Sequence, residues 1–205
     1  MYTPKFNQVH DRVLLIEAMQ AYNFAILFGP QTDGAPVATH LPLVVKDEGP
    51  HGLLEGHFAK ANRHGQSLAG HETLVVFPGP HTYVSPTFYT EPLSVPTWNY
   101  IAIHAYGAME LIEDEPGKET LLKGLIAQHE PAYADRWNAM PEGFRRTMLA
   151  GIVGFRIPIA RIEGKFKVSQ NRAPQERANV RAAHAAGTSD QQALAAWMTR
   201  FESGT

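Results

Sequence analysis

The sequence predicts a mainly β protein: a small barrel of about six antiparallel strands, with helices at the N-terminus, after residue 114 and at the C-terminus. Several short segments alternate apolar with polar residues, and turns rich in glycine and proline separate them. Both features are typical of antiparallel sheets. Strands and helices do not alternate regularly along the chain, which argues against a doubly wound α/β fold.

The first part of the chain is predicted to form one helix and four strands. The helix should begin at a capping side chain, Asn7 or Asp11, and end near Tyr22. Asp33 and Gly34 form the turn signal of a hairpin between the first two strands. The four strands are expected at residues 24–28, 36–45, 52–58 and 74–77.

The second part mixes strands with helices. Asp114 is suited to cap a helix that has Pro116 in its first turn. Pro158 places its own strand at a sheet edge or a bulge. In chain order, we expect a strand at 98–110, helices beginning at 115 and covering 142–150, a strand at 154–162, and helices at 175–186 and 191–201.

The predicted domain organisation is a barrel domain over residues 1–172, with inserted helices at 115–150, and a helical tail over 173–205 that packs on the same domain. Four apolar residues of the tail form a packing stripe: Val180, Leu194, Trp197 and Met198. The chain has 205 residues, 44% of them apolar, a net charge of −2 and no cysteine. Disulfides and thiolate metal sites are therefore excluded. With no signal segment and no membrane-length apolar run, we expect a cytoplasmic protein.

A segment rich in aromatic residues and proline, residues 77–106, is the most informative part of the chain. Its five prolines, at positions 78, 80, 86, 92 and 96, predict a rigid extended loop that leads into the strand at 98–110. Tyr83, Phe88, Tyr89 and Trp98 offer stacking faces. Thr97 and Asn99 can hydrogen-bond the edge of a heterocycle. The segment therefore predicts a site for a planar ligand, although the same aromatic residues are also typical of a core.

Polar residues elsewhere suit the two ends of a flavin mononucleotide. Basic and hydroxyl side chains suited to a phosphate are Lys60, Lys165, Lys167, Ser169 and Arg172. Side chains suited to the edge of an isoalloxazine ring are Thr39, His40, Asn62, Asn99, Gln170 and Asn171. These residue types indicate FMN without separating it from other phosphorylated heterocycles.

Six motifs, in the same order and spanning nearly the whole chain, resemble those of the PaiB family. They are residues 1–6, 38–42, 56–62, 77–86, 95–100 and 167–172. The resemblance implies an FMN-binding split β-barrel similar to pyridoxamine-phosphate oxidases and flavin reductases. It also implies a homodimer with FMN at the subunit boundary. Two departures from the family motifs concern the phosphate: Lys60 replaces an arginine, and Arg63 follows Asn62 where a proline is expected.

The resemblance, combined with the residue types, predicts the residues that bind FMN. They are Thr39, His40, Leu41, His57, Lys60, Asn62, Thr97, Trp98, Asn99, Tyr100, Lys167, Ser169, Gln170 and Asn171. Catalytic residues are not predicted. His57, His81 and His104 are candidate proton donors, but structural histidines are more common. His57, His64 and His71 recur every seven residues, a spacing that matches no metal motif, so no metal site is expected.

The family resemblance implies a negative transcriptional regulator. The alternatives are a flavin-dependent oxidoreductase or flavin reductase and, less favoured, a haem-binding split barrel. Residues 156–205 carry 8 Lys and Arg against 4 Asp and Glu, a basic balance that suits an anionic partner or a solvated surface. No clear DNA-binding motif is present, and the last two helices are better explained as a packed pair. If DNA binds, its candidate contacts are Arg172, Arg177, Arg181 and Arg200.

Overall fold

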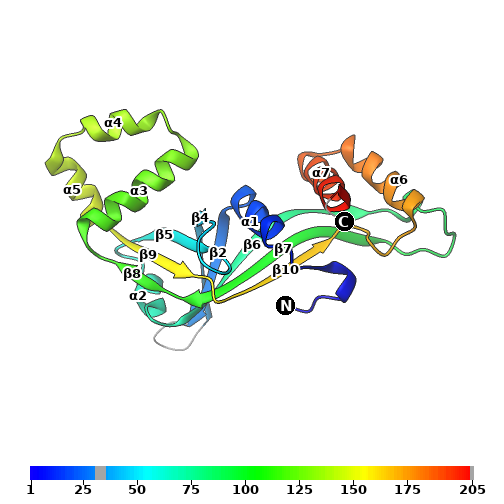
Figure 1. Ribbon diagram of the computed structural model, residues 1–205, viewed down its shortest axis with the longest axis horizontal. Coiled ribbons are helices and arrows are strands. Elements are labelled where there is room, and N and C mark those ends of the chain that lie inside the picture. Colours follow the sequence, from blue (N-terminus) through cyan, green and yellow to red (C-terminus); the bar gives the residue numbers. More distant parts are fainter. Residues whose placement is uncertain (31–35, 204–205) are drawn as a thin grey trace. The chain divides into compact units, whose positions relative to one another are not determined.

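The computed structural model describes residues 1–30 and 36–203, so the predicted turn at Asp33 and Gly34 lies outside the described residues. The chain divides into two compact units. The first comprises residues 1–11, 78–103 and 163–205, and the second comprises 12–77 and 104–162. Two long strands, β6 (Glu72–Val84) and β7 (Thr97–Ala108), contribute residues to both units (Figure 1).

The second unit contains a four-stranded antiparallel sheet. Its order is β4 (Val44–Lys46), β5 (Leu53–Ala59), β9 (Ile152–Pro158) and β8 (Glu110–Ile112). Alternate residues of β5 are buried, and the Phe58 and Phe155 rings lie 4.9 Å apart in its core. In the same unit, β2 (Phe24–Pro30) pairs with β3 (Pro36–Pro42) on one side and with residues 74–76 of β6 on the other.

The described residues of the second unit form five helices. Helix α1 (Arg12–Ala21) buries Leu14, Leu15 and Met19, and α2 (Arg63–Leu68) is a short turn after β5. Between β8 and β9 the chain forms α3 (Glu115–His129), α4 (Tyr133–Ala139) and α5 (Glu142–Ala150) (Figure 1). Asp114 caps α3 by accepting the Gly117 N–H at 2.8 Å, as predicted. Helix α4 was not predicted from the sequence.

The first unit combines sheet strands with the C-terminal helices. Within it, the strand order is β1 (Gln8–Val9), β10 (Arg161–Lys167), β7 and β6. Two 3-10 turns, η1 (Lys5–Asn7) and η2 (Pro86–Phe88), flank these strands. Helices α6 (Pro174–Ala185) and α7 (Ser189–Ser203) pack side by side (Figure 1). The predicted stripe is confirmed, since Val180, Leu194 and Met198 are buried and Trp197 packs edge-on against Phe166.

Three predicted boundaries were wrong. The loop expected from residue 77 begins only after Val84, because β6 continues through Pro78 and Pro80. A strand tolerates proline wherever the missing N–H is not needed for pairing. The strand expected at 36–45 is divided at the buried Leu43, whose N–H donates to the Asn23 carbonyl at 3.0 Å. The strand expected at 154–162 ends at Pro158, and β10 begins three residues later.

The described helices include none that is long and apolar enough to span a membrane. The sheets of antiparallel strands, with helices at the N-terminus, after residue 114 and at the C-terminus, agree with the prediction.

Gly107 of β7 should be intolerant of a side chain. A Cβ atom there would lie 2.2 Å from the Pro158 carbonyl oxygen and 2.7 Å from Ile157 Cγ2. We expect Gly107→Ala to lower the free energy of unfolding by about 1–3 kcal/mol, as measured by urea denaturation. Gly143→Ala is the matched control, because nothing lies within 4 Å of that Cβ position in α5. Equal stability of the two variants would contradict the close approach at Gly107.

Candidate functional site

A pocket of about 640 Å³ in the first unit brings together aromatic and cationic side chains. The N-terminal segment, the start of β7 and the end of β10 with its following turn form its walls. Seven of the residues predicted to bind FMN line it: Thr97, Trp98, Asn99, Tyr100, Lys167, Ser169 and Asn171. The other lining residues are Tyr2, Pro4, Phe6, Asn7, Val95, Pro96, Lys165 and Arg172.

A buried polar pair fixes the turn after β10 against β7. Asn99 Nδ2 donates to the Ser169 hydroxyl at 3.1 Å, and that hydroxyl lies 3.2 Å from Asn99 Oδ1. Both side chains are almost completely buried. Ser169 adopts a left-handed backbone conformation, with φ of 67°, which is uncommon for residues other than glycine. The pair therefore holds a strained turn that carries one wall of the pocket.

Two lysines lie in this pocket without carboxylate partners. Lys167 Nζ donates to the Thr97 hydroxyl and to the Trp98 carbonyl. Lys165 Nζ donates to the Tyr2 carbonyl at 3.1 Å and lies 5.2 Å from the centre of the Tyr100 ring. Within residues 1–30 and 36–203, neither ammonium group forms an ion pair with a carboxylate. Burial, followed by the positive charge of Lys165, lowers the pKa of Lys167.

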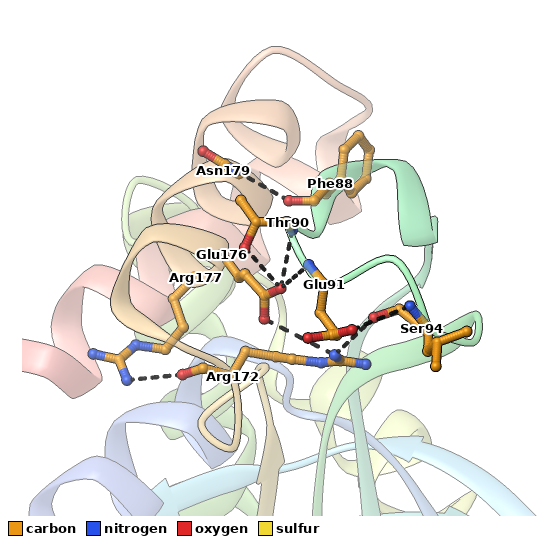
Figure 2. A network of polar contacts seen from close by, with 9 residues as sticks. Phe88, Thr90, Glu91, Ser94, Arg172, Glu176, Arg177 and Asn179 are labelled. Atoms are coloured by element: carbon orange, nitrogen blue, oxygen red, sulfur yellow. Dashed lines mark hydrogen bonds and ion pairs between the residues drawn. The ribbon is translucent and has the colours of Figure 1, made fainter.

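Arg172 is a third cation of the pocket, and neighbouring side chains hold its guanidinium group in position. Its guanidinium carbon lies 3.8 Å from the centre of the Tyr89 ring, and its Nη1 donates to the Ser94 hydroxyl at 3.3 Å. Figure 2 shows this side chain extended between the turn after β10 and the loop that carries Ser94. Three cations beside exposed aromatic faces suit a ligand that is flat at one end and anionic at the other. The residues present therefore fit FMN.

Gln170, also predicted to bind FMN, has a different environment. Its side chain lines a separate pocket with Val168, Arg177 and Met198. The amide donates to the Phe166 carbonyl, and its oxygen accepts the Val168 N–H at 2.8 Å. The structure thus uses this side chain to close the turn after β10.

The remaining six predicted residues belong to the second unit: Thr39, His40, Leu41, His57, Lys60 and Asn62. Thr39 and Asn62 both contact His64. The Thr39 hydroxyl lies 2.8 Å from His64 Nδ1. Asn62 Oδ1 accepts the backbone N–H of His64 at 3.0 Å. His40 and Lys60 are exposed, and Leu41 is half-buried. Burial lowers the pKa of His57. Among the described residues, no cluster of three His, Asp or Glu side chains could hold a metal ion.

The sequence interpretation missed the pocket residues at the N-terminus and the role of His64. Gln8 pairs with Lys165 in the β1–β10 ladder, which brings Tyr2, Phe6 and Asn7 to the pocket. Pairing between residues so far apart leaves no local sequence signal. His64 had a signal, because it follows a capping asparagine, but that pattern predicts only a helix start.

Comparisons with known proteins identify the family of this chain. A family model described as "Putative FMN-binding domain" matches residues 1–161. The chain is 33% identical over 184 residues to the Bacillus subtilis "Protease synthase and sporulation protein PAI 2", covering 88% of this chain and 87% of that relative.

Two solved structures are similar in fold. The flavocytochrome Anf3 from Azotobacter vinelandii aligns with a TM-score of 0.64 at 17% identity, over 80% of this chain and 72% of that one. The FAD and heme binding protein from Mycobacterium smegmatis aligns with a TM-score of 0.59 at 18% identity, over 89% and 81% of the two chains. The predicted split barrel is confirmed.

The stability of the protein should fall in acid because of His64. This side chain is 1% exposed, and burial lowers its pKa below its ordinary value of about 6.5, although an interaction with the Gly29 backbone opposes the shift. The unfolded chain therefore binds the proton first as pH drops below about 6.5, which favours unfolding.

We expect the melting temperature to fall between pH 7.5 and 5.5, by about 2–4 °C for each kcal/mol lost. His64→Gln, which keeps a polar group beside Thr39 but cannot become charged, should reduce that fall. Scanning calorimetry at both pH values measures it, and identical slopes for the variant and the natural protein would contradict the assignment.

Proposed function

We propose that this chain, which belongs to the PaiB family of FMN-binding split-barrel proteins, binds FMN in the first unit's pocket and acts as a cytoplasmic negative transcriptional regulator. One observation carries the assignment of the pocket: Lys165 and Lys167 share it without a carboxylate partner among the described residues. A phosphate monoester bears about −1.5 to −2 charges at neutral pH and would offset both cations.

The pocket's residues divide naturally between the two ends of the ligand. Lys165, Lys167 and Arg172 would hold the phosphate, and the exposed ring of Trp98 would stack on the isoalloxazine. When bound, FMN supplies a ring that accepts a hydride or electrons. The side-chain hydroxyl of Thr97 and the amide of Asn171 offer hydrogen bonds to the polar edge of the ligand.

A homodimer is part of the proposal. Large apolar side chains are exposed around the pocket, including Tyr2 at 85%, Val95 at 71% and Trp98 at 53%. A flat ligand resting on one wall leaves such side chains in water unless another surface covers them. A second copy of the chain would complete the enclosure, in agreement with the dimer that the family resemblance implies.

The phosphate assignment predicts a charge-specific loss of affinity. We expect Lys165→Met or Lys167→Met to weaken FMN binding about tenfold or more, because each removes a charge-assisted hydrogen bond of about 1.5–3 kcal/mol. Riboflavin, which lacks the phosphate, should bind both variants nearly as well as the natural protein. Titrations followed by quenching of flavin fluorescence measure both ligands.

Lys5→Met is the control for this experiment, since Lys5 is an exposed cation of the same unit outside the pocket lining. Lys60→Met tests the phosphate position suggested by the family motif. Full FMN affinity in the Lys165 and Lys167 variants, with a loss in the Lys60 variant, would move the phosphate to the second unit.

An absorption spectrum of the purified protein separates flavin from haem.

The regulatory role rests on the family and on the basic C-terminal segment. Arg177 and Arg181 both contact the Glu202 carboxylate, so DNA phosphates would have to compete with that partner. Arg177 also donates to the Arg172 carbonyl at 3.3 Å, which makes it unsuitable for a test that must spare the pocket. Arg181 and Arg200 are the better choices.

We expect the double variant Arg181→Gln, Arg200→Gln to bind promoter DNA about tenfold more weakly, with a salt dependence reduced by about one unit per lost contact. FMN affinity should be unchanged. Gel-shift titrations at several salt concentrations measure the effect. Salt-insensitive NADH or NADPH oxidation with added FMN, in the absence of any DNA shift, would instead establish the oxidoreductase alternative.

A further inference from the structure

We propose that Glu176 of α6 is a positioning residue for the flavin pocket: it holds the loop of residues 90–94 and orients Arg172 toward the ligand's phosphate. The proposal rests on the assignment of this pocket to FMN. Glu176 lies beyond residue 161, where the family match ends, and outside the pocket lining itself. It would therefore act through the groups that it holds.

The Glu176 carboxylate binds the backbone of the loop. Its Oε1 accepts the Thr90 N–H at 3.0 Å, the Glu91 N–H at 3.1 Å and the Thr90 hydroxyl at 3.3 Å. Figure 2 shows these donors converging on one oxygen from the loop side. The side chain is 5% exposed. The hydrogen bonds, first that from the Glu91 N–H, lower the pKa of Glu176, which keeps the group ionised at neutral pH.

The other carboxylate oxygen faces Arg172. Glu176 Oε2 lies 3.9 Å from Arg172 Nη1, which is an ion-pair distance and longer than a hydrogen bond. The carboxylate thus attracts the guanidinium without occupying its donors. Tyr89 stacks on the guanidinium plane and Ser94 accepts from Nη1. A guanidinium has five N–H donors, so several remain for a phosphate in the pocket.

Helix α6 also holds the loop at its other end. Asn179 Nδ2 donates to the Phe88 carbonyl at 3.1 Å, and the Phe88 ring lies edge-on to His184, 6.3 Å between ring centres. Glu176, Asn179 and His184 lie near the spacing of one helix face. The held loop continues directly into Val95, a wall residue of the pocket. One face of α6 therefore determines where that wall begins.

The affinities for two ligands separate positioning from a purely structural role. Loss of a structural contact would weaken FMN and riboflavin equally, whereas loss of Arg172 orientation weakens only the ligand with a phosphate. Because Glu176→Ala also releases the loop, we expect it to weaken both ligands, but FMN about tenfold more than riboflavin. Glu176→Gln keeps an oxygen for the loop N–H groups, so it should restore stability and part of the FMN affinity.

The experiment uses the full chain in two backgrounds, the natural sequence and Arg172→Met. Glu91→Gln is the control, because it removes one exposed negative charge from the same loop; the Glu91 Oε1 accepts the Leu93 N–H at 3.3 Å. In an Arg172→Met background, Glu176→Gln should no longer change the ratio of FMN to riboflavin affinity, since the two residues act in series. Melting temperatures verify that each variant is folded.

Each outcome has one meaning. Failure of the natural protein to bind FMN would overturn the proposed function. If the ratio of FMN affinity to riboflavin affinity in both Glu176 variants equals that of the natural protein, the positioning role alone would be overturned. An additive effect of Glu176→Gln in the Arg172→Met background would do the same. A selective FMN loss that disappears in that background supports the proposal.

Discussion

The pocket depends on one buried polar pair, the side chains of Asn99 and Ser169. Each satisfies the other in a site that water does not reach, and an unsatisfied buried amide would cost about 1–3 kcal/mol. The pair joins β7 to the turn that follows β10, so the two walls that carry Trp98 and Lys167 keep a fixed separation. Without it, the left-handed conformation of Ser169 would relax and the turn would lose its direction.

The arrangement of charges in the pocket lowers the stability of the folded protein. Burial raises the cost of charging Lys167, and repulsion from Lys165 adds to it, as the lowered pKa of Lys167 shows. A fold optimised only for stability would place a carboxylate beside them. Groups held in unfavourable electrostatic surroundings concentrate at functional sites. These unfavourable surroundings support the proposal of an anionic ligand in the pocket.

Local patterns predicted most of the elements, and long-range pairing explains what they missed. Asp114 and Pro116 located α3 because capping depends on nearby residues alone. The prediction of a loop at Pro78 and Pro80 was wrong, because whether a strand tolerates proline depends on how it pairs with neighbouring strands. Lys167 and Asn99, both selected by residue type, line one pocket. The contribution of Tyr2 depends on the pairing of β1 with β10, which no local pattern encodes.

Residue 161, where the family match ends, separates the aromatic residues of the pocket from its cationic residues. Residues 1–161 include the aromatic and amide side chains of Trp98, Asn99 and Tyr100, whereas Lys165, Lys167 and Arg172 come after that boundary. Glu176, which contacts Arg172, also follows it. A flat ring can stack on the first group whatever the charge of the second, but retention of a phosphate requires the second. In the proposed binding mode, selectivity for a phosphorylated ligand would therefore be set by β10, its turn and α6, which form one continuous segment of the chain.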